Sequence, residues 1–88
     1  MAALLVTYDL KKPSQDYKEL IDAIKKYAWA RLSESSYAID ASDETPKQVY
    51  TKLSQYIDKD DQLFVVSLKT GWHGRGSEKI YEWLNNHL

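Results

Sequence analysis

Asp9 is the residue of this sequence whose type and position most favour chemistry. It ends an aliphatic segment at 3–9, Ala-Leu-Leu-Val-Thr-Tyr-Asp, which has the composition of a β-strand. A carboxylate at a strand end can act as a general base or hold Mg²⁺ together with water molecules. Asp40 and Asp43 follow a later apolar segment, and we expect them to approach Asp9 on the assumption that the two strands are parallel neighbours. The alternative, which the residues leave open, is that Asp9 only accepts hydrogen bonds from loop amides.

A second candidate site is the loop at 70–76, which contains all three glycines of the chain. It also holds three side chains that could contact an anion or a base: Trp72, His73 and Arg75. Ser77 follows as the start of a helix, and the amide groups at a helix N-terminus can bind phosphate. The glycine spacing matches neither a Walker motif nor a dinucleotide fingerprint. The pattern therefore indicates an anion or nucleotide contact, with a plain connection between strand and helix as the alternative.

The overall composition limits the function. The 88 residues form one domain, 1–88, with 12 Lys and Arg against 13 Asp and Glu and a net charge of −1. This balance disfavours a strongly basic nucleic-acid binder, although Lys11, Lys12 and Arg31 are candidates for nucleic-acid or anion contacts. The absence of cysteine excludes disulfides and thiol catalysis. The apolar runs are far shorter than the ~18 residues of a membrane span and no signal peptide is recognised, so we expect a cytoplasmic protein without membrane contact.

Apolar segments and helix-start signals predict the elements that must position these residues. Strands are expected at 3–9, 28–34, 36–41 and 63–68. The middle two form a hairpin or, alternatively, one bent strand. Helices are expected to begin after the capping residues Ser14, Thr45 and Ser77. Thr45 is followed by Pro46 and Gln48, which predicts a capping box with proline at the first helical position.

The order β-α-β-β-α-β-α predicts an α+β fold, a ferredoxin-like β-α-β-β-α-β sandwich with an added C-terminal helix. The expected sheet order is 4-1-3-2, with both crossover helices on one face. The other face would be open and would carry aliphatic side chains, among them Leu5, Leu63 and Val65. Such a patch needs a cover. The C-terminal helix and a second copy of the chain are the candidates, and we expect a homodimer.

The run Leu-Val-Thr-Tyr-Asp-Leu at 5–10 resembles the opening strand of the CRISPR-associated Cas-two proteins and of VapD-like toxins. This resemblance implies a dimeric, ferredoxin-like protein in which Asp9 is the metal-binding residue associated with nuclease activity, with Mg²⁺ as the metal. Over a longer stretch the chain is similar to small bacterial proteins labelled SinR family, through the segments 5–13, 34–40, 61–66 and 83–88.

Three functions follow as hypotheses. The residues favour a small dimeric interaction module with a protein partner, because the open face is apolar and no complete catalytic set is recognised. The resemblance implies the alternative, a metal-dependent endoribonuclease or nucleic-acid-associated protein in which Asp9 is catalytic. A second alternative is a domain that binds a nucleotide or a small anion through residues 71–77. The fold by itself does not decide among the three.

Overall fold

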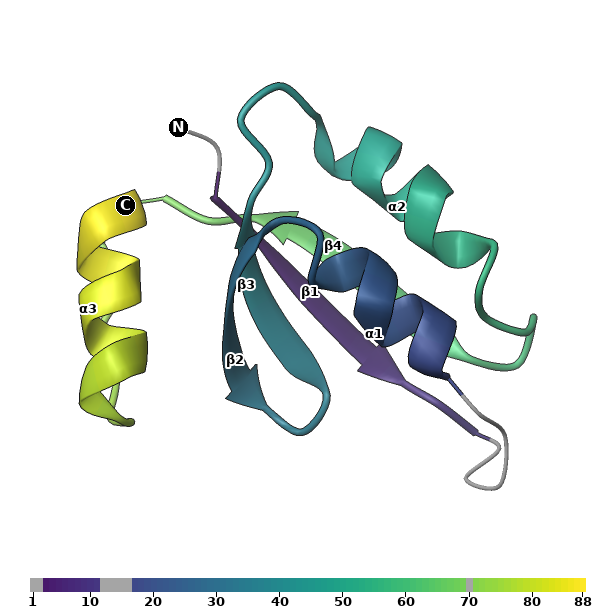
Figure 1. Cartoon of the computed structure of the whole chain (residues 1–88), viewed down its shortest axis with the longest axis horizontal. Helices are drawn as coiled ribbons and strands as arrows, with labels where there is room; N and C mark the ends of the chain where they lie inside the picture. Colours follow the sequence, from purple (N-terminus) through teal and green to yellow (C-terminus); the bar gives the residue numbers. More distant parts are fainter. Residues whose placement is uncertain (1–2, 12–16, 70) are drawn as a thin grey trace.

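The computed structural model describes residues 3–11, 17–69 and 71–88 and has an α+β fold (Figure 1). Its elements follow one another in the expected order: β1 (Ala3–Asp9), α1 (Lys18–Ile24), β2 (Ala28–Ser33), β3 (Ser36–Asp40), α2 (Pro46–Ser54), β4 (Gln62–Ser67) and α3 (Glu78–His87). The strands form one antiparallel sheet in the order β2-β3-β1-β4. This is the expected 4-1-3-2 order, read from the other edge.

Two helices cover one face of the sheet and the third lies on the other side. α1 and α2 lie together beside the sheet, and α3 is set apart from them across it (Figure 1). The core lies under α1 and α2 because alternate β1 residues point there: Leu4, Val6 and Tyr8 are buried. Leu20 and Ile24 of α1 and Val49 and Leu53 of α2 complete this layer.

The antiparallel pairing of β1 and β3 corrects one prediction. Ala3 lies opposite Asp40 in the sheet register, so Asp40 is at the start of β1 and Asp9 is at its end. The expected approach of Asp40 and Asp43 to Asp9 is therefore wrong. β1 and β3 are not parallel, as that prediction assumed. β3 lies between β1 and β2 and runs antiparallel to both of them.

The face assignment of β4 is also corrected. Leu63 and Val65 pack against the core, whereas Phe64 and Val66 are 59% and 48% exposed on the other face. The register gives the reason, because Phe64 lies opposite Thr7, whose side chain points away from the helices. β4 is apolar on both faces, so its alternation alone could not indicate which face is inward.

Local capping signals place two of the helices. Thr45 Oγ1 accepts the Gln48 backbone N–H at 3.2 Å, and Gln48 Oε1 accepts the Thr45 N–H at 2.8 Å, which confirms the capping box. Ser77 Oγ accepts the Ile80 N–H at 3.3 Å and caps α3. The third predicted cap, Ser14, lies outside the described residues, as does Lys12.

Candidate functional site

Asp9 lies where the sequence predicts it, at the end of a central strand. It pairs in register with Gln62 of β4, and its side chain is exposed to solvent. Lys11 Nζ is 2.8 Å from Asp9 Oδ2. The hydrogen bond and the negative charge of Asp9 raise the pKa of the Lys11 ammonium group. Asp9 is therefore a solvent-facing carboxylate with a cation already beside it.

The nearby carboxylate of Asp61 has a structural role. Its Oδ1 accepts the Lys11 backbone N–H at 2.8 Å, and its Oδ2 accepts the Asp58 N–H at 2.9 Å. The Tyr17 hydroxyl donates to the same carboxylate, 3.1 Å from Oδ2. These bonds join the segment after β1 to α1 and to the loop before β4. This role could not be predicted from the sequence, because Lys11 and Tyr17 are 50 and 44 residues from Asp61 and are brought to it only by the fold.

The residues around Asp9 do not fit a resident magnesium ion within one chain. Over residues 3–11, 17–69 and 71–88, no group of three His, Cys, Asp or Glu side chains could hold a metal ion. Asp40 and Asp43 are at the opposite end of the sheet. Glu34 lines the same shallow pocket as Asp9, so a Mg²⁺ ion held by these carboxylates would take its remaining ligands from water and phosphate oxygens.

Arg31, predicted as a nucleic-acid or anion contact, stabilises the β2–β3 turn. Its guanidinium donates to the backbone carbonyls of Ser33 and Glu34 at 3.2 and 3.0 Å and lies over the Tyr37 ring. The Tyr8 hydroxyl donates to the same Glu34 carbonyl at 3.2 Å. Burial raises the pKa of the Tyr8 phenol. Arg31 remains at the exposed surface at the Asp9 end of the sheet.

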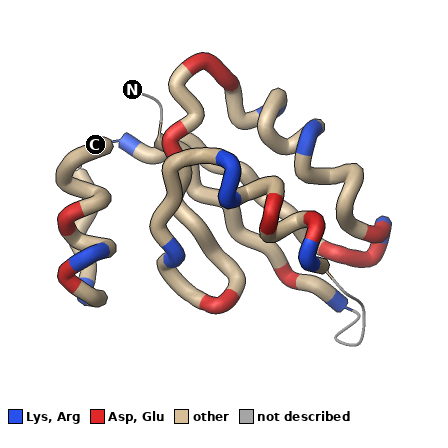
Figure 2. The backbone as a smooth tube through the Cα atoms, in the orientation of Figure 1, with Lys and Arg blue, Asp and Glu red and all other residues tan. Residues whose placement is uncertain are grey.

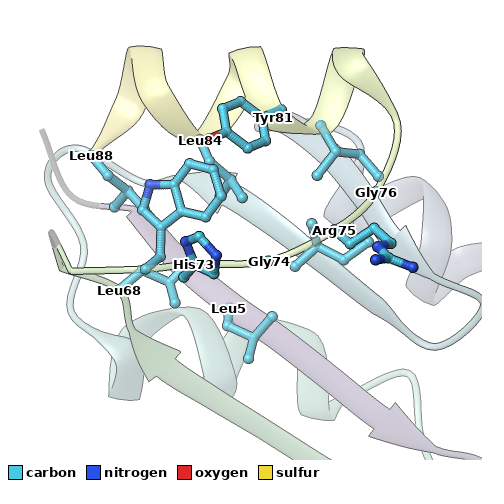
Figure 3. Close-up of a pocket in the computed structure, with 12 residues that line it drawn as sticks. Leu5, Leu68, His73, Gly74, Arg75, Gly76, Tyr81, Leu84 and Leu88 are labelled. Carbon is cyan, nitrogen blue, oxygen red and sulfur yellow. The ribbon is translucent and has the colours of Figure 1, made fainter.

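The other predicted contacts, Trp72, His73 and Arg75, lie at a different place. They line a cavity of about 280 Å³ between α3 and the sheet (Figure 3). Neither Asp9 nor Lys11 is among the lining residues. The structure therefore divides the predicted contact residues into two groups, one at the end of β1 and one under α3.

A polar cluster that the sequence analysis did not single out lies between α1 and α2. The Tyr27 hydroxyl donates to Glu44 Oε1 at 3.0 Å, and Lys52 Nζ lies 2.7 Å from Glu44 Oε2. The interaction with Lys52, assisted by the Tyr27 hydrogen bond, lowers the pKa of Glu44. Burial and the hydrogen bond to Glu44 raise the pKa of Tyr27 to about 12. The cluster holds the segment before α2 against the end of α1.

Positive and negative residues alternate along the part of the chain that the structure describes. Figure 2 shows Lys and Arg interspersed with Asp and Glu along the described helices and loops, in agreement with the net charge of −1. None of the described helices is long and apolar enough to cross a membrane.

Comparison with known proteins identifies the family. The family model described as CRISPR associated protein Cas2 matches residues 1–75, which include all four strands and both core helices and leave α3 outside. No curated protein matches the chain. The match agrees with the strand that ends at Asp9 and with the antiparallel α+β fold. The resemblances to VapD-like and SinR-family proteins remain predictions. The chain belongs to the CRISPR-associated Cas2 family.

Proposed function

We propose that this protein acts as a homodimer that binds nucleic acid. The family match over residues 1–75 carries the proposal, because a dimer and an association with nucleic acid are what membership of this family implies. The protein has a net charge of −1, and its Lys and Arg are interspersed with Asp and Glu along the described backbone (Figure 2). We therefore expect weak binding through few Lys and Arg side chains, and binding that falls as salt is added.

The end of the sheet at Asp9 is the surface that we propose for this contact. Lys11 and Arg31 both lie there, and the Lys11 side chain is 51% exposed. Asp9 neutralises Lys11 at 2.8 Å and would repel an approaching phosphate. The replacement Asp9→Asn removes one negative charge and releases the ammonium group of Lys11 for a phosphate.

If this end of the sheet binds nucleic acid, the variant Asp9→Asn should have a higher affinity for nucleic acid than the unaltered protein. In anisotropy titrations with labelled RNA and DNA at about 50 mM salt, we expect Asp9→Asn to bind about three-fold more tightly and Lys11→Gln more weakly. The matched control is Asp43→Asn, which makes the same charge change at an exposed position at the other end of the sheet. If Asp43→Asn has the same effect as Asp9→Asn, the contact is not at Asp9, and if the unaltered protein shows no binding, the proposal is wrong.

A second candidate function, Mg²⁺-dependent cleavage of nucleic acid, is favoured by the exposure of the Asp9 carboxylate. No three His, Cys, Asp or Glu side chains of the described residues form a metal site, so we expect this function to use the Asp9 side chains of two copies that face one another across a two-fold axis. The test is cleavage of RNA and DNA with Mg²⁺ and with a chelator, for the unaltered protein and Asp9→Asn. Cleavage that Asp9→Asn loses while it still binds supports this function, and equal cleavage by both proteins excludes Asp9 as the catalytic residue.

A further inference from the structure

The cavity of about 280 Å³ between α3 and the sheet is lined by Leu5 of β1, by Leu32 of β2 and by residues of the stretch 68–88, which includes α3. Leu5 comes from β1, Leu68 follows β4, and Leu84 and Tyr81 come from α3 (Figure 3). Six aliphatic side chains make most of its wall: Leu5, Leu32, Leu68, Ile80, Leu84 and Leu88. The wall is therefore suited to an apolar body.

Two aromatic rings complete the wall. Trp72 and Tyr81 pack edge to face with their centroids 4.9 Å apart and an interplanar angle of 71°. This is a favourable arrangement for aromatic pairs, and it fixes the orientation of both rings. A planar ring system could pack against them inside the cavity.

The polar groups of the cavity are positive or neutral. Arg75 and His73 line it, and no Asp or Glu side chain is among the described lining residues. Arg75 is exposed and makes no ion pair with another described residue. Within the described part of the chain, no backbone–backbone hydrogen bond involves residues 71–76, so the amide groups of this loop are not used by the fold. The guanidinium group of Arg75 is therefore the positive group of the described lining that the fold leaves without an ion-pair partner.

We propose that this cavity binds a small organic anion: a body of one or two ring systems, or a short hydrocarbon chain, that carries one carboxylate or sulfonate group. The apolar body would pack against the aliphatic side chains, Trp72 and Tyr81. The anionic group would form an ion pair with Arg75. The volume is slightly below the roughly 300–1,000 Å³ typical of ligand sites, which favours a small ligand. This site is distinct from the Asp9 end of the sheet, and the proposal does not depend on nucleic-acid binding.

The packing of α3 supports this assignment. α3 is amphipathic, yet none of its residues is fully buried, although its apolar side chains lie over the sheet. The side chains around an empty space of this size lack packing contacts on the side that faces it. A ligand that fills it supplies those contacts, so binding should stabilise the folded protein and raise its melting temperature.

Two related probes separate the apolar and the charged parts of the proposal. Anilinonaphthalene sulfonate has two ring systems and one negative charge, whereas phenylnaphthylamine has the same rings without the charge. We expect both to bind with increased fluorescence. Arg75→Gln should weaken the sulfonate about five-fold and leave the neutral probe within two-fold. Lys79→Gln is the matched control, because Lys79 is an exposed cation on α3 that does not line the cavity.

A third variant tests the cavity itself. A Cβ atom added at Gly76 would lie 4.0 Å from Ile80 Cδ1, an ordinary contact directed towards the cavity wall. Gly76→Leu should therefore fold, as circular dichroism would verify, and should reduce the binding of both probes at least ten-fold. Unchanged binding of both probes by folded Gly76→Leu would overturn the proposal, as would an equal effect of Arg75→Gln on the two probes. Loss of binding in Phe64→Ser would also overturn it, because the probes would then lie on the exposed face of β4.

Discussion

Tyr27 is the residue whose protonation the fold alters most clearly. Its hydroxyl is partly buried and donates to Glu44 at 3.0 Å, and its pKa is raised to about 12. Ionisation would place a phenolate beside a carboxylate, so the neutral form is favoured in the folded state. A folded-state pKa above the unfolded value contributes stability that is present below the unfolded pKa and lost as pH rises through the folded pKa.

We therefore expect stability to fall between pH 10 and about 12 through this residue. Tyrosinate absorbance is measured as a function of pH for the unaltered protein and for Tyr27→Phe. The difference between the two curves should be the titration of one tyrosine with a midpoint near pH 12. Tyr50→Phe, at an exposed position on α2, is the control. A difference curve for Tyr27→Phe that coincides with that for Tyr50→Phe would show that burial and the hydrogen bond to Glu44 do not raise the pKa of Tyr27 in solution.

At the residue scale, the sequence correctly predicted the position of a residue when that position depends on a single strand or helix. Asp9 was placed correctly because the strand that ends there determines its position. Asp61 and Glu44 were not singled out, because their partners come from segments up to 50 residues away and no local pattern marks them. Arg31 remains a predicted ligand contact, and its second role, in which two backbone carbonyls of its own hairpin accept its N–H groups, was not predicted.

At the scale of elements, the capping box of α2 makes a quantitative prediction. Thr45→Ala removes the side chain that accepts the Gln48 N–H at 3.2 Å and leaves that donor without its cap. The expected loss is about 1 kcal/mol in the free energy of unfolding, measured by urea denaturation. Thr51→Ala is the matched control, since Thr51 lies inside the same helix and its hydroxyl donates to the Lys47 carbonyl. A loss that is equal for the two variants would show that the cap does not stabilise α2.

The elements themselves were largely predictable, and their orientation was not. Capping residues and apolar segments gave the order of strands and helices because these signals are local. The pairing directions and the inward face of β4 depend on contacts between segments, and both expectations about them were wrong. Leu63 and Val65 were expected on the open face, but the register with β1 turns them towards the helices and leaves Phe64 and Val66 exposed.

At the scale of the whole molecule, α3 covers only part of the sheet. Ala30 and Ala38 are buried on the face that α3 overlies, whereas Phe64 and Val66 are exposed on the same face towards the β4 edge. β4 is an edge strand, so its outer backbone groups also have no neighbouring strand among residues 3–11, 17–69 and 71–88. Exposed apolar side chains beside an unpaired edge are suited to a second copy of the same surface.

This surface gives the prediction for the assembly. We expect a dimer mass by light scattering at tens of micromolar, and a monomer mass for Phe64→Lys, because a lysine at the centre of a symmetric contact places two like charges close together. Tyr50→Lys is the matched control: Tyr50 is 44% exposed and Phe64 is 59% exposed, but Tyr50 lies on α2, which covers the opposite face of the sheet. A dimer that survives Phe64→Lys and is lost in Tyr50→Lys would place the interface on the helical face. A monomer mass for the unaltered protein would contradict the homodimer, and α3 would then be the sole cover of this face.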